Sequence, residues 1–233
     1  MYTVSAAILD ALHEAGVSYI FANLGSDHPA FIESIAEARG TGRPLPRLIT
    51  CPNEMTALSA AHGFAQITGR AQAVLVHVDC GTLSLGGAIH NAAKGRVPVL
   101  IFAGESPITQ GGEMRGSRNE FIHWIQDVFD QPGIVRGYVK YNYQIRTGAN
   151  AKQMVHRALQ FAYSDPQGPV YLTAAREILE LEASSAPIDP ADYAPPRPSP
   201  IAASDAASLV EELITARRPL IVSLCLVVIR VGL

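Results

Sequence analysis

The sequence predicts an α/β fold in which a parallel sheet is covered by helices on both faces. Helical and extended patterns alternate along roughly the first 180 residues, with short connections between them. Two extended segments, 73–78 (AVLVHV) and 98–103 (PVLIFA), are continuously apolar, which is typical of strands buried on both faces of a parallel sheet. Repeated strand, loop and helix units favour right-handed crossovers, so the strands are expected to run in one direction.

The expected elements follow from hydrophobic spacing and from the residues that begin and end helices. Strands are expected at residues 19–23, 48–50, 73–78, 98–103 and 169–173, with a turn at residues 79–82. Helices are expected between Thr3 or Ser5 and Gly16, and at residues 29–39, 52–69, 85–93, 150–163 and 204–216. The polar, glycine-rich residues 106–118 are expected to form a loop, followed by a short helix over residues 119–129 in which Trp124 packs into the core.

Glu54 is a carboxylate at the start of an otherwise largely apolar helix. Pro52 suits the first turn of this helix, and Gly69 suits its end. A carboxylate in the first turn is stabilised by the helix dipole while exposed to water, so the position alone leaves a structural role open beside a functional one.

Polar and glycine residues follow four of the predicted strands. They are Gly25-Ser26, Cys51 to Glu54, His77 to Thr82 and Gly104-Glu105. Ligands of open parallel sheets bind beyond the carboxyl ends of the strands. We therefore expect a site at this edge, with Gly25, Glu54 and Gly81 in one neighbourhood.

The sequence predicts three successive segments. Residues 1–180 are expected to form the α/β domain, and residues 181–200 a linker, because residues 184–200 contain six prolines among small and acidic residues. Residues 201–233 are expected to be the incomplete start of a second α/β domain. The apolar run from Pro219 begins like a strand and is too short to span a bilayer.

Composition excludes several classes of partner. The net charge of -3 over 233 residues gives no electrostatic reason to expect nucleic acid or an anionic membrane. The three cysteines, Cys51, Cys80 and Cys225, have neither metal-ligand spacing nor an even count for a disulfide framework, which favours a reducing compartment. The first residues read as a helix rather than a signal peptide, so a cytoplasmic location is expected.

These motifs resemble the N-terminal pyrimidine-binding domain of the thiamine diphosphate-dependent 2-oxo acid decarboxylases and acetolactate synthase-like enzymes. The resemblance covers residues 4–179 and implies the thiamine diphosphate-binding fold. The motifs that carry it are Asn23 to Ser26, Asn53-Glu54, Ala60 to Ala65, Gly81-Thr82, Asn91-Ala92, Val97 to Val99 and Asp165 to Leu172.

Within this family, the local motifs are most similar to those of benzoylformate decarboxylase. The loop Asn23 to Ser26 resembles that enzyme's N-P-G-S loop with leucine in place of proline, which implies that Ser26 contacts the substrate carboxylate. His77 follows Glu54 by twenty-three residues, the spacing of a histidine in that enzyme, which implies a proton relay. A histidine at a strand end can equally serve only to bond a carbonyl group, so both interpretations stay open.

The resemblance also implies how a cofactor would be held. Glu54 is implied to hydrogen-bond a ring nitrogen of the aminopyrimidine of thiamine diphosphate. In this family the C2 carbanion of the cofactor is the reactive group. The other implied cofactor contacts are Gly25, Gly81, Thr82 and Asn91. Gln126 is a candidate substrate contact that matches an acetolactate synthase glutamine after a shift of one residue.

The sequence departs from the family at the diphosphate end of the cofactor. The family binds the diphosphate through Mg²⁺ on a C-terminal domain that carries Gly-Asp-Gly followed by Asn-Asn, and this sequence contains no Asp-Gly pair. We therefore assign no metal ligand and expect half of a cofactor site. FAD, which some relatives bind, is not supported, because the middle domain is only begun.

Two functions stay open. The first is non-oxidative decarboxylation or carboligation of a small 2-oxo acid, with this chain supplying the pyrimidine-binding half of the site. The second is a catalytically silent, truncated homologue that pairs with full-length relatives. Retention of Glu54, Ser26 and His77 favours the first function, and the missing diphosphate motif favours the second. A homo-oligomer or a full-length relative is the expected partner.

Overall fold

The computed structural model describes residues 1–220. The chain separates into two compact units, Met1–Pro196 and Arg197–Leu233. In the second unit the described residues contain helix α9 (Ala203–Thr215), whose side chains are mostly exposed. The strand expected from Pro219 onward lies almost entirely outside the described residues, as does Cys225.

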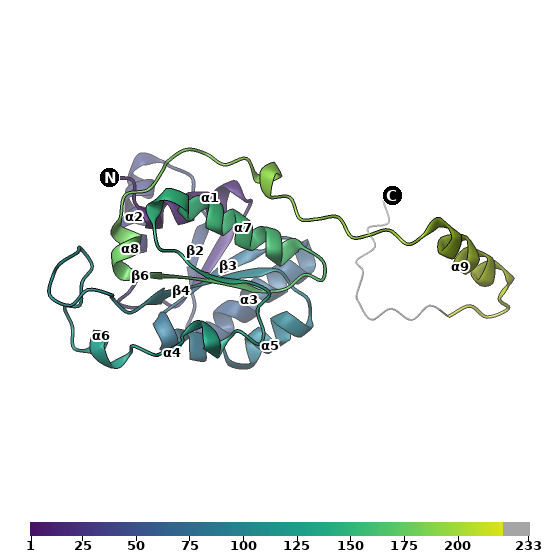
Figure 1. Cartoon of the computed structure of the whole chain (residues 1–233), viewed down its shortest axis with the longest axis horizontal. Coiled ribbons are helices and arrows are strands. Elements are labelled where there is room, and N and C mark those ends of the chain that lie inside the picture. Colours follow the sequence, from purple (N-terminus) through teal and green to yellow (C-terminus); the bar gives the residue numbers. More distant parts are fainter. Residues whose placement is uncertain (221–233) are drawn as a thin grey trace. The chain divides into compact units, whose positions relative to one another are not determined.

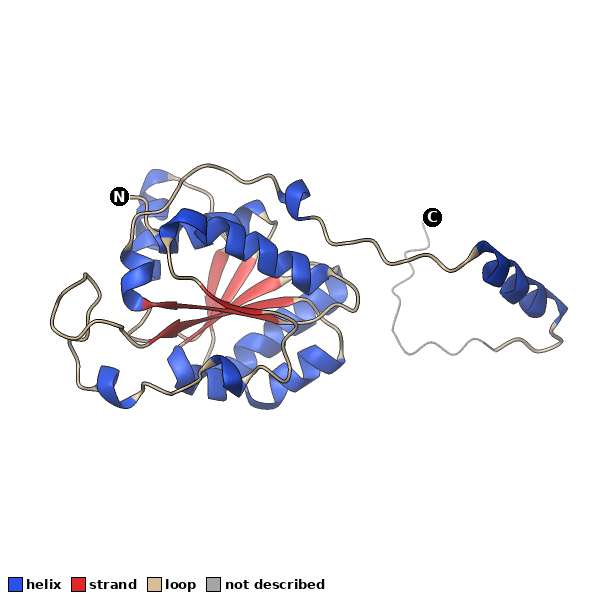
Figure 2. Ribbon diagram, viewed as in Figure 1, coloured by secondary structure: helices blue, strands red, loops and turns tan. Residues whose placement is uncertain are grey.

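The larger unit contains a six-stranded sheet, and every strand pair among the described residues is parallel. Figure 2 shows the strands as one twisted layer between helices. The strand order is β2 (Arg47–Thr50), β1 (Tyr19–Ala22), β3 (Gln72–Val76), β4 (Val99–Glu105), β6 (Val170–Ala175) and β5 (Asn142–Gln144). The predicted parallel α/β fold is confirmed.

Helices cover both faces of the sheet (Figure 1). One face carries α1 (Val4–Glu14), α2 (Pro29–Thr41), α7 (Ala151–Tyr163) and α8 (Arg176–Glu180). The other face carries α3 (Glu54–Thr68), α4 (Val78–Leu83) and α5 (Gly86–Lys94). The remaining short elements of the larger unit are α6 (Ile122–Ile125) and the 3₁₀ turns η1 (Pro132–Ile134), η2 (Gly148–Asn150) and η3 (Pro190–Tyr193).

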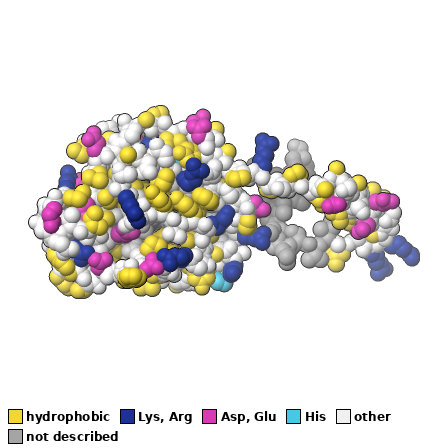
Figure 3. All heavy atoms as spheres, viewed as in Figure 1, with side chains coloured by type: hydrophobic (Ala, Val, Ile, Leu, Met, Phe, Trp, Pro, Cys, Tyr) yellow, Lys and Arg dark blue, Asp and Glu magenta, His cyan; other side chains and the backbone are white. Residues whose placement is uncertain are grey.

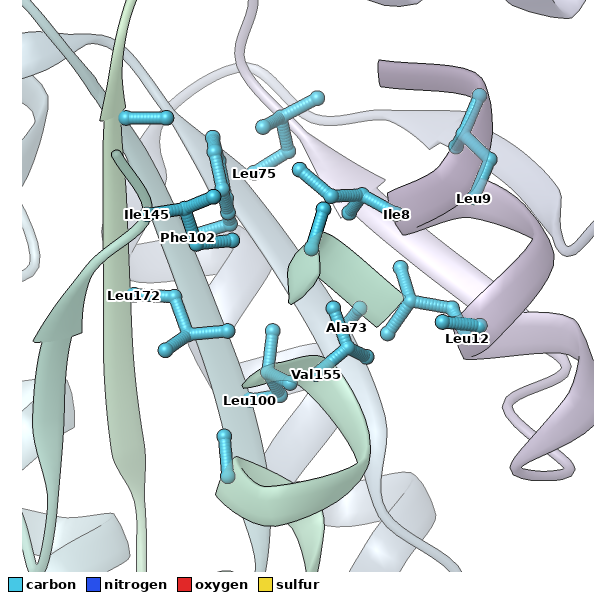
Figure 4. Packing of buried hydrophobic residues seen from close by; sticks show 14 of the residues in the cluster. Ile8, Leu9, Leu12, Ala73, Leu75, Leu100, Phe102, Ile145, Val155 and Leu172 are labelled. Carbon is cyan, nitrogen blue, oxygen red and sulfur yellow. The ribbon is translucent and has the colours of Figure 1, made fainter. Parts of the chain in front are cut away.

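The central strands divide their side chains between two cores. Ala73 and Leu75 of β3 join the cluster under α1, α2 and α7, while Val74 and Val76 join the cluster under α3 and α5. Figure 4 shows the first cluster, in which Leu100 of β4 lies among side chains of α1, α7 and β6. Because both faces are covered, these strands bury apolar side chains on both sides, which explains the continuous hydrophobic runs.

Three expectations about local structure were wrong, and two short elements were not expected. Residues 79–82 belong to helix α4 rather than to a turn, because β3 ends at Val76 and Val78 turns the chain with a positive φ of 26°. Strand β5 and helix α8 were not expected, since both are short and β5 is a partly exposed edge strand. The helix expected over residues 119–129 is the single turn α6. Trp124 is 49% exposed instead of packing into the core.

Part of the Pro-rich segment is fixed along the larger unit. The Ala183 N–H donates to the Tyr2 carbonyl at 3.0 Å, and Lys152 Nζ donates to the Ala186 carbonyl at 3.0 Å. Gln160 reaches the Ala194 carbonyl at 2.8 Å. The boundary between the two units lies two residues later, after Pro196.

Charge on the visible surface is mixed. On the face of the larger unit that Figure 3 shows, acidic and basic side chains are interspersed among hydrophobic ones. None of the helices in residues 1–220 is long and apolar enough to cross a bilayer.

Truncation of a central core side chain should destabilise the domain far more than truncation of a surface one. Leu100 is fully buried in β4, so Leu100→Ala should lower the free energy of unfolding by about 2–5 kcal/mol. Ile67 is 84% exposed on α3, so Ile67→Ala should change it by no more than about 0.5 kcal/mol. Chemical denaturation measures both values, and equal losses would contradict the described core.

Candidate functional site

Glu54 is buried at the carboxyl edge of the sheet. Asn53 caps α3 by accepting the Thr56 N–H at 2.8 Å, which sets Glu54 at the first helical position. The Glu54 residue is only 8% exposed, and Asn23, directly after β1, donates from Nδ2 to Glu54 Oε1 at 3.0 Å. A buried carboxyl group requires such a partner. The water-exposed arrangement that the helix dipole alone would allow is therefore not the one observed.

Gly81 leaves room beside this carboxyl group. A Cβ atom at position 81 would lie 3.3 Å from Glu54 Oε1 and equally close to Val76. The neighbouring Thr82 turns inward: its hydroxyl donates to the Val78 carbonyl at 2.6 Å and lies 2.8 Å from the Tyr171 hydroxyl. The structure therefore places Gly81 next to Glu54 and uses the side chain of Thr82 to join α4 to β6.

Tyr171 is the centre of a buried polar network beneath the site. Gln131 Nε2 donates to the Tyr171 hydroxyl at 3.0 Å and to the Gly104 carbonyl at 2.8 Å. Burial raises the pKa of Tyr171, although bonds to Thr82 and Gln131 oppose this. The phenol consequently stays neutral, and the network holds α4, β4 and β6 in register with one another.

His77 lies between β3 and α4 and is bonded to a buried carboxylate. Its Nδ1 is 2.5 Å from Oδ1 of Asp27, which is 3% exposed in the loop after β1. Burial lowers the pKa of His77, but the hydrogen bond and charge of Asp27 outweigh it and leave the pKa above its ordinary value. A Cβ atom at Gly25 would lie 2.2 Å from the His77 ring. The imidazole therefore packs directly on the loop Asn23 to Ser26, called the glycine loop below.

His28 belongs to the same cluster. Its Nδ1 is 3.2 Å from Asp27 Oδ1 and accepts the Gly25 N–H at 2.9 Å. Burial lowers the pKa of His28, and Asp27 only partly opposes this. The loop after β1 therefore carries Ser26, half-buried, next to a buried acid and a buried histidine.

The loop after β4 brings Gln126 to His77. Glu177, buried at the start of α8, accepts the Thr109 N–H at 2.8 Å, and Arg118 Nε donates to the Pro107 carbonyl at 2.9 Å. With the loop fixed in this way, the side chain of Gln126 lies close enough to His77 to help raise the pKa of the imidazole. The weak sequence match of Gln126 thus corresponds to a position within the site.

Asn91 is set apart from these groups. It is exposed in the middle of α5, and its Oδ1 lies 3.2 Å from Nδ1 of the adjacent His90. Its role toward a cofactor stays a prediction.

A polar cavity of about 810 Å³ opens beyond the ends of β4 and β5. Glu105, Arg118, Asp127 and Arg146 are among its lining residues, which include neither Glu54 nor His77. Glu54 and His77 therefore lie outside the lining of this cavity. Within residues 1–220, no three side chains of His, Cys, Asp or Glu are grouped so that they could hold a metal ion.

Two contacts of the site were not anticipated from sequence. The bond from Asn23 to Glu54 joins residues 31 apart, and the bond from His77 to Asp27 joins residues 50 apart. In the sequence, Asn23 is the first residue of the glycine loop and Asp27 directly follows Ser26. Neither pairing could be assigned without the order of the strands.

The family comparison agrees with this geometry. Residues 2–134 match the family described as thiamine pyrophosphate enzyme, N-terminal TPP binding domain. The chain belongs to the thiamine pyrophosphate enzymes. The match contains Ser26, Asp27, Glu54, His77 and Gln126.

Relatives of this thiamine pyrophosphate enzyme domain include both synthases and decarboxylases. The chain is 28% identical to the acetolactate synthase large subunit of Lactococcus lactis over 225 residues, covering 94% of this chain and 36% of that protein. It is 27% identical to the benzoylformate decarboxylase of Pseudomonas aeruginosa over 173 residues, covering 74% of this chain and 30% of that protein. The chain thus spans about a third of the length of these relatives.

The fold is also similar to that of a solved thiamine diphosphate-dependent 4-hydroxybenzoylformate decarboxylase from Rhodococcus jostii. The TM-score is 0.72 at 22% identity, covering 93% of this chain and 38% of that one. At this identity the likeness shows the fold alone.

A side chain at position 25 should displace His77. Because the added Cβ atom would meet the imidazole at 2.2 Å, Gly25→Ala should lower the free energy of unfolding by about 1–3 kcal/mol and shift the His77 ring signals in an NMR spectrum. Gly63→Ala is the matched control, since a Cβ atom there meets nothing within 4 Å in the interior of α3, and it should stabilise by about 0.5–1 kcal/mol. Unchanged His77 signals in Gly25→Ala would contradict the described packing.

Proposed function

We propose that this chain supplies the pyrimidine-binding half of a thiamine diphosphate-dependent site for the non-oxidative decarboxylation or carboligation of a 2-oxo acid. The observation that carries the proposal is the buried Glu54 carboxyl group, held by Asn23 at the carboxyl edge of a parallel sheet. This is the edge at which such sheets bind ligands.

The residues present fit the aminopyrimidine end of the cofactor. One oxygen of Glu54 is fixed by Asn23, which orients the carboxyl group, and Gly81 keeps the adjoining space free of a side chain. The exposed side chains of Met55 and Leu83 flank the start of α3 and the end of α4, where they can pack on an apolar ring. The diphosphate and Mg²⁺ would be held by residues outside this chain.

The proposed roles of the side chains follow from their positions. When bound, thiamine diphosphate supplies a carbanion that adds to the carbonyl group of a 2-oxo acid. The Glu54 carboxyl group would exchange a proton with the aminopyrimidine ring nitrogen. The Ser26 hydroxyl would donate to the substrate carboxylate, and Gly25 would let the glycine loop approach the ring of His77.

His77 would move a proton at the product stage. Its Nδ1 is engaged by Asp27, so Nε2 is the nitrogen available for proton transfer. Gln126, which lies near this imidazole, would contact the substrate or orient the ring. Synthases and decarboxylases among the relatives support both outcomes, an aldehyde or a carboligation product.

The second candidate is a catalytically silent homologue that pairs with longer relatives. The observation that favours it is that these 233 residues contain no Asp-Gly pair for the diphosphate-binding motif.

Activity should require the other half of the site. Most cofactor affinity is expected from Mg²⁺ and charge-assisted bonds to the diphosphate, so this chain alone should bind thiamine diphosphate no more tightly than roughly millimolar and should not decarboxylate pyruvate or benzoylformate. Calorimetry and an assay of released CO₂ measure both. Turnover by the 233-residue chain alone would contradict the half-site.

Joined to the remaining two-thirds of a relative, the chain should become active, and Glu54→Gln should then reduce kcat by about 10²–10⁴-fold because the amide cannot deliver a proton. Glu37→Gln, an exposed change on α2, is the matched control and should leave kcat unchanged. A folded, cofactor-binding but inactive joined protein would favour the silent homologue. Full activity in Glu54→Gln would refute the role of Glu54.

We also propose that the edge around the site pairs with another subunit. Exposed apolar side chains gather in the segment that carries Gln126, including Phe121, Ile125 and Phe129. An apolar patch around Met55, Leu83 and Leu85 is also predicted from the family resemblance; Met55 and Leu83 are exposed, but Leu85 is fully buried and is not part of such a surface.

Self-association should depend on this segment. The chain should sediment as a dimer or larger species, and the double variant Ile125→Ser with Phe129→Ser should weaken association at least tenfold, since each loses apolar area that binding would bury. Ile67→Ser, at a side chain that is 84% exposed on α3, is the control and should have no effect. A wild-type monomer at high concentration would refute the proposed surface.

A further inference from the structure

We propose that Asp27 is a positioning residue that fixes the His77 imidazole as the Nδ1–H tautomer and leaves Nε2 as its proton-transfer atom. The catalytic consequence rests on the function proposed above. The tautomer itself is a property of this chain and can be measured without a cofactor.

The carboxylate of Asp27 binds two successive residues at the start of α4. Its Oδ1 lies 2.5 Å from His77 Nδ1, and its Oδ2 accepts the Val78 N–H at 3.3 Å. Val78 is a β-branched residue with φ of 26°, a conformation that such residues rarely adopt. Asp27 therefore binds both the side chain and the backbone at the bend that directs His77 toward the edge.

Two glycines leave space for the side chains of Asp27 and His77. A Cβ atom at Gly104, near the end of β4, would lie 1.8 Å from Asp27 Oδ2. A Cβ atom at Gly25 would lie 2.2 Å from Cγ and Nδ1 of His77. Two glycines from separate segments thus leave the space that the acid and the imidazole occupy. A surface ion pair would not require this space.

Protonation states follow from the groups that face the pair. Burial raises the pKa of Asp27, but His28, His77 and the Val78 N–H outweigh it, so that its pKa is below the ordinary value. An ionised carboxylate can only accept, so the hydrogen between Asp27 and His77 belongs to Nδ1 of His77.

Other groups around the imidazole are weaker influences. The charge of Asp79 on α4 raises the pKa of His77, as does the nearby side chain of Gln126. His28 also lies near this ring, with centroids 6.4 Å apart. Asp27 is the acid that bonds the imidazole directly, which makes it the residue to test.

The test is NMR of the full 233-residue chain labelled with ¹⁵N-histidine, with the His77 signals assigned by their loss in His77→Gln. The neutral His77 ring should be the Nδ1–H tautomer. In Asp27→Asn its pKa should fall by about one to three units, the effect of removing an opposite charge at this distance. Asp79→Asn is the matched control and should keep the tautomer with a smaller fall.

A neutral Nε2–H tautomer in the wild-type chain would overturn the proposal, and this measurement needs no variant. An unchanged His77 titration in a folded Asp27→Asn chain would overturn it equally. Backbone amide spectra report whether each variant is folded.

Catalysis provides a separate readout in the chain joined to the rest of a relative. Asp27→Asn should lower kcat tenfold or more and shift the pH dependence of kcat, with KM changed less than threefold. If the wild-type joined protein is inactive, the proposed function fails while the NMR result still decides the tautomer. If Asp27→Asn retains wild-type kcat and pH dependence, the positioning role is overturned.

Discussion

Two buried carboxyl groups at one edge of the sheet require partners, and the structure around them supplies these partners. Glu54 bonds Asn23, and Asp27 bonds His77 and the Val78 N–H. A buried carboxylate without such bonds would be strongly destabilising. The loop after β1 contributes to both pairs, since it holds Asn23 and Asp27, and this connects the proposed cofactor contact to the proposed proton relay.

The sheet makes this arrangement possible. Because β1 lies between β2 and β3, the residues that follow these three strands meet at one edge although they are far apart in the sequence. The paired main-chain groups and the two apolar cores hold the strand ends in place, so that the polar side chains rest on rigid elements. The strand ends therefore hold these polar side chains in fixed positions relative to one another.

The sequence predicts the long elements well because their hydrophobic pattern matches their burial. The strand at residues 98–103, a short and continuously apolar run, and the helix at 150–163, with apolar residues at helical spacing, are examples. Strand β5 was missed because it has three residues and is largely exposed, and α4 because the positive φ of Val78 has no signature in a valine. Motif spacing made Glu54, His77 and Gln126 candidates for the site, whereas the pairs Asn23–Glu54 and Asp27–His77 depend on strand order.

The distance between a Glu54 carboxyl oxygen and the aminopyrimidine ring nitrogen of bound thiamine diphosphate tests the proposed role of this edge most directly. It would be measured in a crystal structure of the chain joined to the remainder of a relative, with cofactor and Mg²⁺. The expected result is a hydrogen bond of about 2.6–3.2 Å with Asn23 still bonded to Glu54. A cofactor ring bound elsewhere, with Glu54 beyond hydrogen-bonding reach, would contradict it.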